Sequence, residues 1–163
     1  MFGFKMIGNW DVSMKKLKGL NEDMFKASLA GQRRAARKYK RTVKNHLIKQ
    51  DLPWEPLQPK TIEDKGHDKI LIDTRLYLQS ITEFRKQYVY YVGIKSGTRY
   101  ENGKDVARIA RIHEVKSYRG GPYRALWNPS YEELGGAEGM KLIVQKTIEE
   151  KMKTRGWKLK RLF

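Results

Sequence analysis

Residues 51–81 read DLPWEPLQPKTIEDKGHDKILIDTRLYLQSI, and this segment sets the order of the elements around it. Its three prolines exclude a helix between Trp54 and Leu57, because proline lacks an N–H group and restricts the residue before it to extended backbone. We therefore expect Trp54 and Leu57 to anchor a stiff, extended arm in the core. Pro59 suits the first turn of a short helix, which is expected to end at Gly66.

The second half of the segment predicts a strand followed by a capped helix. Ile70–Ile72 is a short apolar run bounded by polar residues, which favours a strand. Asp73 or Thr74 can cap the helix that follows, and the apolar residues of this helix continue to Ile81.

This order of anchor, helix, strand and capped helix resembles the phage virion-morphogenesis or tail-completion family, which includes Mu-like tail-completion and tail-to-head joining proteins. The chain departs from the family pattern at Gln58, where serine is common, and at Arg75, where glycine is usual. An arginine at this position implies that the helix start needs no special backbone freedom. The positions that match the pattern are Trp54, Pro56, Leu57, Pro59, Thr61, Lys65, Gly66, Leu71, Asp73, Thr74, Ser80 and Ile81.

The composition describes a strongly basic chain without cysteine. Among 163 residues, 35 are Lys or Arg and 18 are Asp or Glu, which gives a net charge of +17. This charge favours a polyanionic neighbour, either nucleic acid or an acidic protein surface. No apolar run approaches the roughly 20 residues of a membrane-spanning helix, and the first residues lack the flanks of a signal peptide. Assembly in the cytoplasm is therefore expected.

Three elements are expected before the extended arm. Residues 2–7 show a weak period of two, which is typical of a strand. Asp11 can cap a short helix that ends near Gly19. A long amphipathic helix then follows from Asn21 to Gln50, with an acidic first turn and a basic remainder. Its basic surface faces either solvent, DNA or an acidic partner, and it consists of Arg33, Arg34, Arg37, Lys38, Lys40, Arg41 and Lys44.

A β-hairpin is predicted after the capped helix, with strands over residues 82–86 and 88–94. Aromatic side chains on both faces of the second strand indicate that both faces are covered, either by the core of the same chain or by a neighbouring subunit. The polar segment over residues 95–105 contains two glycines and is expected to be a mobile loop.

Val106–Glu114 fits a short helix better than a strand, and it matches the Ala-x-x-His-Glu pattern of the family at His113 and Glu114. A second histidine four residues after the first would be needed for a zinc-protease motif, and it is absent, so His113 is expected to be structural. Arg124 matches the arginine of an Arg-Pro-Phe-Leu stretch in the family. We expect it to pair with a carboxylate, either Glu114 or Asp73.

Two further helices are expected after residue 127. Ser130 and Glu133 have the spacing of a capping box for the first of them, and the glycines at 135–136 separate it from the second. The tail after Gly156 mixes basic and apolar residues. It is either a segment that docks on another chain or a frayed end, and its docking residues would be Trp157, Leu159 and Phe163.

No catalytic constellation is predicted. The three histidines, His46, His67 and His113, are dispersed, and His46 has no carboxylate close to it within the basic helix. No glycine motif that holds phosphate is present. We therefore expect no enzymatic activity, no cofactor and no metal ion.

Together these features predict a single α+β domain over residues 1–156, followed by a tail over residues 157–163. The domain would contain a long N-terminal helix, a small antiparallel sheet with a β-hairpin, and C-terminal helices. The resemblance implies a structural protein of the phage neck, found in the virion, which completes the tail or joins it to the head as one subunit of a ring, commonly a hexamer, around the DNA channel. Its partners would be further copies of itself and the adjoining neck and tail proteins, with packaged DNA as a further contact and no membrane. The alternative is a non-enzymatic DNA-binding protein that uses the basic helix over residues 31–50.

Overall fold

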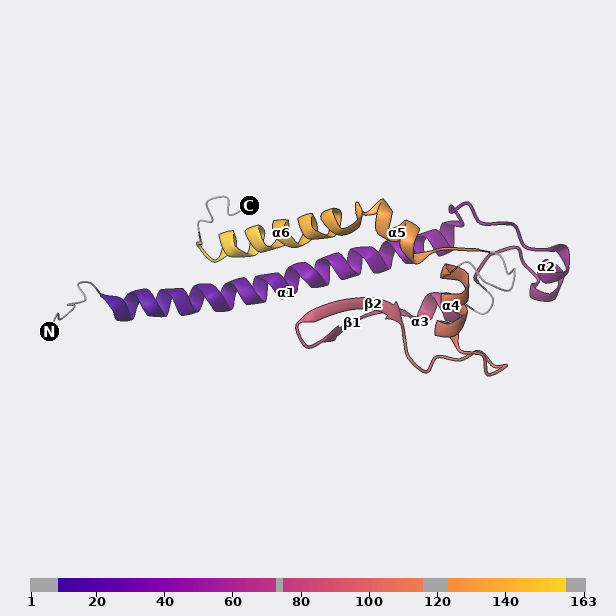
Figure 1. The fold of residues 1–163 in the computed structure, drawn as a ribbon, viewed down its shortest axis with the longest axis horizontal. Helices are drawn as coiled ribbons and strands as arrows, with labels where there is room; N and C mark the ends of the chain where they lie inside the picture. Colours follow the sequence, from indigo (N-terminus) through magenta and orange to yellow (C-terminus); the bar gives the residue numbers. More distant parts are fainter. Residues whose placement is uncertain (1–8, 73–74, 116–122, 158–163) are drawn as a thin grey trace.

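Figure 1 shows the computed structural model, which describes residues 9–72, 75–115 and 123–157. The molecule is elongated, with one long helix in the middle, a second helix along one side and a β-hairpin along the other. The expected α+β fold is therefore confirmed. Its elements are α1 (Trp10–Lys49), α2 (Pro59–Lys65), α3 (Leu76–Ser80), β1 (Ile81–Lys86), β2 (Val89–Ile94), α4 (Val106–Glu114), α5 (Trp127–Glu133) and α6 (Gly136–Thr154). The strand expected over residues 2–7 lies outside the described residues.

The central helix α1 is one uninterrupted element, so the predicted break near Gly19 and the new helix start at Asn21 are wrong. A glycine weakens a helix interior by about 1 kcal/mol but does not end it, and lysine and leucine, which favour helices, surround Gly19. Asp23, which was expected in the acidic first turn, consequently lies inside the helix. Its carboxylate instead accepts hydrogen bonds from Arg155 and from Trp157 Nε1, the latter at 2.9 Å.

These contacts of Asp23 fasten the end of α6 to α1. Trp157 was one of the residues expected to contact another chain if the tail is a docking segment. It contacts α1 of its own chain instead. Leu159 and Phe163 lie outside the described residues.

A row of small residues lets α6 pack closely against α1. Ala27, Gly31 and Ala35 recur at intervals of four residues on α1, and all three are buried. A Cβ atom on Gly31 would lie 2.9 Å from the carbonyl oxygen of Val144 in α6. The close approach of the two helices therefore depends on the missing side chain at this position.

The predicted β-hairpin is confirmed. Its two strands are antiparallel, with Ile81 opposite Ile94 and Lys86 opposite Val89. Ile81 was expected to belong to the preceding helix, but it begins β1 because α3 ends at Ser80.

The hydrophobic core lies at the junction of α1, α3, β1, α4 and the start of α5. Trp54 packs against this core, and its Nε1 atom donates a hydrogen bond to the carbonyl oxygen of Ala125 at 2.8 Å. The predicted role of Trp54 as an anchor of the extended arm is thus confirmed. The buried core residues are Val43, Leu47, Ile72, Tyr77, Ile81, Val106, Ala110 and Leu126.

The predicted helix at residues 59–65 is confirmed, but the strand at Ile70–Ile72 is not. Leu71 has a φ of 57°, which belongs to a turn and not to a strand. The side-chain amide of Gln50 takes the place of a neighbouring strand as the hydrogen-bond partner of the Ile70 backbone. Its Nε2 donates to the carbonyl oxygen of Ile70 at 3.1 Å, and its Oε1 accepts from the Ile70 N–H at 2.7 Å.

Arg75, the residue before α3, has a φ of 60° and lies in the left-handed region. The expectation that this helix start needs no special backbone freedom is therefore wrong, because left-handed backbone is the conformation that favours glycine. Asp73 and Thr74, the predicted caps of this helix, lie outside the described residues.

Arg75→Gly is expected to raise the free energy of unfolding by about 0.5–1 kcal/mol, because glycine adopts this backbone without a Cβ penalty. Arg75→Ala is the matched control, since it removes the same exposed side chain but keeps the Cβ atom. Urea unfolding followed by circular dichroism would compare the two variants. Equal effects of glycine and alanine would show that the backbone at residue 75 is not strained.

Residues 95–105 form a loop that is held by its own backbone hydrogen bonds. The Tyr100 N–H donates to the carbonyl oxygen of Lys104, and the Gly103 N–H donates to that of Tyr100, both at 2.9 Å. The mobility of this loop stays a prediction.

The helix predicted at Val106–Glu114 is confirmed as α4, and the side chain of Asp105 caps it by accepting a hydrogen bond from the Arg108 N–H at 3.0 Å.

The start of α5 differs from the predicted capping box. The helix begins at Trp127, so Ser130 lies within it, fully buried, and its hydroxyl donates to the carbonyl oxygen of Leu126. Glu114 at the end of α4 takes the capping role. Its carboxylate accepts from the N–H groups of Leu126, Trp127 and Asn128 at 2.8, 3.0 and 2.8 Å. A negative group at a helix N-terminus is favourable, so this contact across twelve residues replaces the local cap.

Arg124 does not use Glu114 as its partner, contrary to one of the two predicted pairings. Its side chain is buried, and its Nη2 atom donates to the carbonyl oxygens of Glu55 and Pro56 at 3.3 and 3.5 Å. Asp73, the other predicted partner, lies outside the described residues. Arg124 therefore fixes the extended arm through the backbone of the arm.

The predicted glycine break at 135–136, between α5 and α6, is confirmed, with φ values of 84° and 57°.

Candidate functional site

The basic residues of α1 line an open cleft of about 820 Å³ on the solvent-exposed side of the helix. Ile143, Lys146 and Glu150 of α6 border it on one side, and Tyr90 of β2 contributes from the hairpin. Leu29 and Ala30 of α1 add apolar atoms. We call this feature the basic cleft, and its cations are Arg33, Arg34, Arg37, Lys38, Arg41 and Lys146.

Five of the seven predicted basic residues therefore belong to the cleft, and two do not. Lys40 turns towards the hairpin and pairs with Glu83. Lys44 is half-buried near Lys40, and its pKa is lowered by burial and by the neighbouring positive charge. Helical spacing predicted the row of cations correctly, but it could not show which of them the hairpin would engage.

Two carboxylates from other elements engage part of the basic row. Arg34 pairs with Glu150 of α6 at 2.7 Å, and Arg37 pairs with Glu83 of β1 at 3.4 Å. The ammonium group of Lys40 and the guanidinium of Arg37 hold the pKa of the Glu83 carboxyl below its usual range. No ion pair within the described part of the chain involves the remaining cleft residues of α1, which are Arg33, Lys38 and Arg41.

The sequence offered no signal for the walls of the cleft. Tyr90, Ile143 and Lys146 lie far from the basic row along the chain, and each has an ordinary place in the pattern of its own strand or helix. Only the packing of α6 and the hairpin on α1 brings them to the basic row.

One face of the hairpin is apolar and exposed. Phe84 and Tyr91 lie opposite each other in the register, and their rings stack with centroids 5.5 Å apart at an angle of 15°. Their exposed fractions are 47% and 45%, and Val89 is exposed beside them. These three residues form what we call the hairpin outer face. The prediction that both faces are covered holds within the described chain only for the inner face, which packs on α1.

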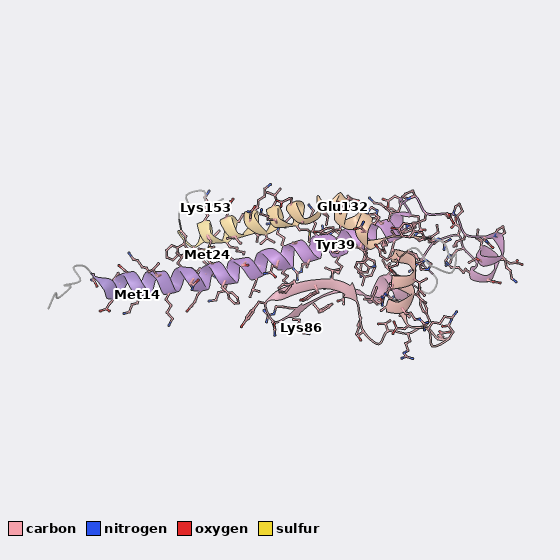
Figure 2. The ribbon with its side chains drawn as sticks, in the orientation of Figure 1. Met14, Met24, Tyr39, Lys86, Glu132 and Lys153 are labelled. Carbon is pink, nitrogen blue, oxygen red and sulfur yellow. The ribbon has the colours of Figure 1, made fainter. Side chains whose placement is uncertain are left out.

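A second apolar surface lies at the N-terminal end of α1, which extends past both α6 and the hairpin (Figures 1 and 2). All side chains from Asp11 to Lys18 are exposed. Met14 and Leu17, three residues apart on one side of the helix, are about 60% exposed each. We call residues 10–18 the α1 overhang.

The family-motif residues occupy a different part of the molecule. Leu57, Thr61, His113 and Arg124 all line a cavity of about 240 Å³ between the extended arm, α2 and α4. Ser80 is buried close by, and its hydroxyl donates to the Tyr77 carbonyl oxygen at 2.7 Å. These contacts and the capping by Glu114 give the motif residues structural roles in this fold.

His46 has carboxylate neighbours that its sequence position did not reveal. Its Nδ1 atom lies 2.5 Å from Asp51 Oδ1, and its Nε2 atom lies 2.7 Å from Glu133 Oε2. The hydrogen bond to His46 lowers the pKa of Asp51. This buried histidine joins the end of α1 to the arm and to the end of α5. No group of His, Asp or Glu side chains in the described residues is arranged to hold a metal ion.

None of the described helices is long and apolar enough to cross a membrane. No protein-family model, no curated protein and no solved structure matches this chain. The features that bear on its function are the sequence motifs and three surfaces: the basic cleft, the hairpin outer face and the α1 overhang.

Proposed function

We propose that this chain is a structural subunit of a phage neck, which completes the tail or joins it to the head as part of a ring around the DNA channel. The observation that carries the proposal is the presence of two different apolar surfaces that the described residues leave uncovered, the hairpin outer face and the α1 overhang, on one elongated subunit. Exposed, contiguous apolar patches mark interaction sites. A ring requires heterologous contacts, in which one patch meets a different patch of the next subunit.

The motif residues around Trp54 support the same proposal, because they resemble those of the tail-completion family. In this proposal the overhang and the hairpin face serve contacts between copies, commonly six in such rings. The loop over residues 95–105 and the tail beyond Trp157 would contact adjoining head-completion, adaptor or tail proteins. The basic cleft remains available for an acidic partner or for DNA.

The test is the mass of the purified protein in solution, measured by light scattering at moderate salt with and without duplex DNA. We expect a discrete, ring-sized oligomer whose mass does not depend on DNA. The variant Phe84→Ser/Tyr91→Ser removes the stacked pair and should reduce this oligomer to smaller species. The variant Ile112→Ser/Tyr123→Ser is the matched control, because it removes two similarly exposed apolar side chains elsewhere. A wild-type protein that is monomeric under both conditions would contradict self-assembly of the isolated chain.

The second candidate function is non-enzymatic DNA binding, and the observation that favours it is the row of cations on α1. A monomer that changes mass only in the presence of DNA would support this alternative. Its affinity should then fall steeply with rising salt, because each neutralised phosphate releases counterions.

A further inference from the structure

We infer that the basic cleft binds an acidic, amphipathic helix of a partner protein. The inference rests on the proposed function, in which each subunit contacts adjoining neck proteins, and it adds the chemistry by which one of them is recognised. Three properties of the cleft carry it: its excess charge, the spacing of its cations and its apolar surface.

The charge of the cleft is far from balanced. Six cations line it, against the single carboxylate of Glu150, which is already engaged by Arg34. Arg33, Lys38 and Arg41 are exposed and form no ion pair within the described residues. Copies of a chain with a net charge of +17 repel one another. An acidic ligand in the cleft would therefore also reduce the repulsion between neighbouring subunits.

The cations follow the geometry of a helix surface. Arg33, Arg37 and Arg41 recur every four residues, which places successive residues about 6 Å apart along α1, and Arg34 and Lys38 form a parallel row. Acidic residues at intervals of four on a partner helix have the same spacing, so several pairs can form in register. The arginine side chains favour carboxylates in particular, because a guanidinium can donate two parallel hydrogen bonds to one carboxylate.

The apolar residues of the cleft favour a protein over a nucleic acid. Leu29, Ala30, Ile143 and Tyr90 are half-buried among the cations. The apolar stripe of an amphipathic helix can pack on such side chains, as in other helix-in-groove complexes. A phosphate backbone gains nothing from aliphatic side chains, and single-stranded nucleic acid usually stacks on several aromatic rings. Tyr90 is the one aromatic residue that lines this cleft within the described chain.

Reading of duplex DNA through the major groove is also disfavoured by the arrangement of the elements. A recognition helix must enter the major groove, but the basic part of α1 lies between α6 and the hairpin (Figure 1). These neighbours flank the helix on two sides and would meet the DNA backbone first.

The test is fluorescence anisotropy with four labelled probes at a salt concentration of about 150 mM. The main probe is a synthetic helical peptide of about 20 residues, with glutamates every four positions and leucines along one side. The other probes are polyglutamate of equal charge, a duplex DNA and a single-stranded oligonucleotide. We expect the wild-type chain to bind the peptide at least about tenfold more tightly than any of the other three.

Two charge-matched variants locate the binding site. Arg33→Glu/Arg37→Glu/Arg41→Glu reverses three cations of the cleft and should weaken peptide binding at least about tenfold. Lys60→Glu/Arg108→Glu/Arg111→Glu reverses three exposed cations of α2 and α4, outside the cleft and both apolar surfaces, and should change the affinity less than about threefold. Ile143→Ser should weaken binding of the peptide but not of polyglutamate. Circular dichroism would establish that each variant is folded.

Equal losses in the two charge variants would overturn the inference, since they would show attraction to the overall charge of the chain. Tighter binding of either nucleic acid than of the peptide would overturn it in favour of the DNA-binding alternative. Failure of the ring proposal is a separate result: a monomer by light scattering that still binds the peptide in the cleft keeps this inference. A ring-sized oligomer that does not bind the peptide keeps only the ring.

Discussion

Gly139→Ala is expected to lower the free energy of unfolding by about 3 kcal/mol or more, although alanine is the better helix former by about 1 kcal/mol. The reason is the tight junction between α5 and α6. A Cβ atom at residue 139 would overlap the carbonyl oxygen of Leu134, so the backbone at this junction would have to shift to accommodate it. Urea unfolding followed by circular dichroism would measure the loss.

Two further glycine variants provide the controls for this result. Gly19→Ala makes the same change in the exposed part of α1, where a Cβ atom would meet nothing within 4 Å. It should therefore stabilise the protein by about 0.5–1 kcal/mol. Gly31→Ala should fall between the two, since its Cβ atom would lie 2.9 Å from the Val144 carbonyl oxygen. If Gly139→Ala and Gly19→Ala were equally stabilising, the close junction between α5 and α6 would be excluded.

Glu114→Ala is expected to destabilise the protein by about 3 kcal/mol, because it leaves three N–H groups at the start of α5 without their acceptor. Glu114→Gln keeps the shape and one carbonyl oxygen, so it should lose about half as much. The measurement is the shift in the midpoint of urea unfolding.

Glu138→Ala is the matched control for the Glu114 variants. Among the described residues Glu138 pairs only with Lys141, at 3.5 Å, and both side chains are exposed, so its removal should change stability by less than about 0.5 kcal/mol. A loss as small as this in Glu114→Ala would contradict the capping role of Glu114.

The elements with strong local signals were predictable from sequence. Pro59 and Gly66 bound α2 as expected, the alternating residues predicted over 82–94 form the hairpin, and Val106–Glu114 is a helix. In each case the residues that determine the element lie within it or next to it. Local reasoning is sufficient for such elements.

Two of the errors occurred where a distant side chain supplies what a local one would have supplied. Glu114 caps α5 from another helix, so the capping box at Ser130 is not used. Gln50 pairs with the backbone of Ile70, which makes a strand there unnecessary. The left-handed backbone of Arg75 could not be predicted, because arginine, unlike glycine, does not favour this conformation. Such contacts depend on the folded arrangement and cannot be seen in a local pattern.

Part of the candidate site was likewise predictable from local sequence, and part of it depends on how distant elements pack. The basic row of α1 follows from helical spacing, which the sequence contains. The roles of Glu83, Tyr90 and Ile143 follow from how the hairpin and α6 pack on α1. Aromatic residues were predicted on both faces of the second strand, with both faces covered, but the described chain leaves Tyr91 exposed and stacked on Phe84 of the first strand.

The contacts of Arg155 and Trp157 with Asp23 separate the free N-terminal part of α1 from the part that packs in the fold, so the length of the free part can change on its own. They fix the point at which α1 leaves the body of the protein, so residues 10–22 form an arm of about 20 Å. Adding or deleting whole helical turns between Asp11 and Leu20 would lengthen or shorten this arm without altering any contact of the core. The length of this segment can thus change while the rest of the fold stays the same. In the proposed ring, a related protein with a longer or shorter N-terminal segment of α1 would fit a more distant or a closer neighbouring subunit.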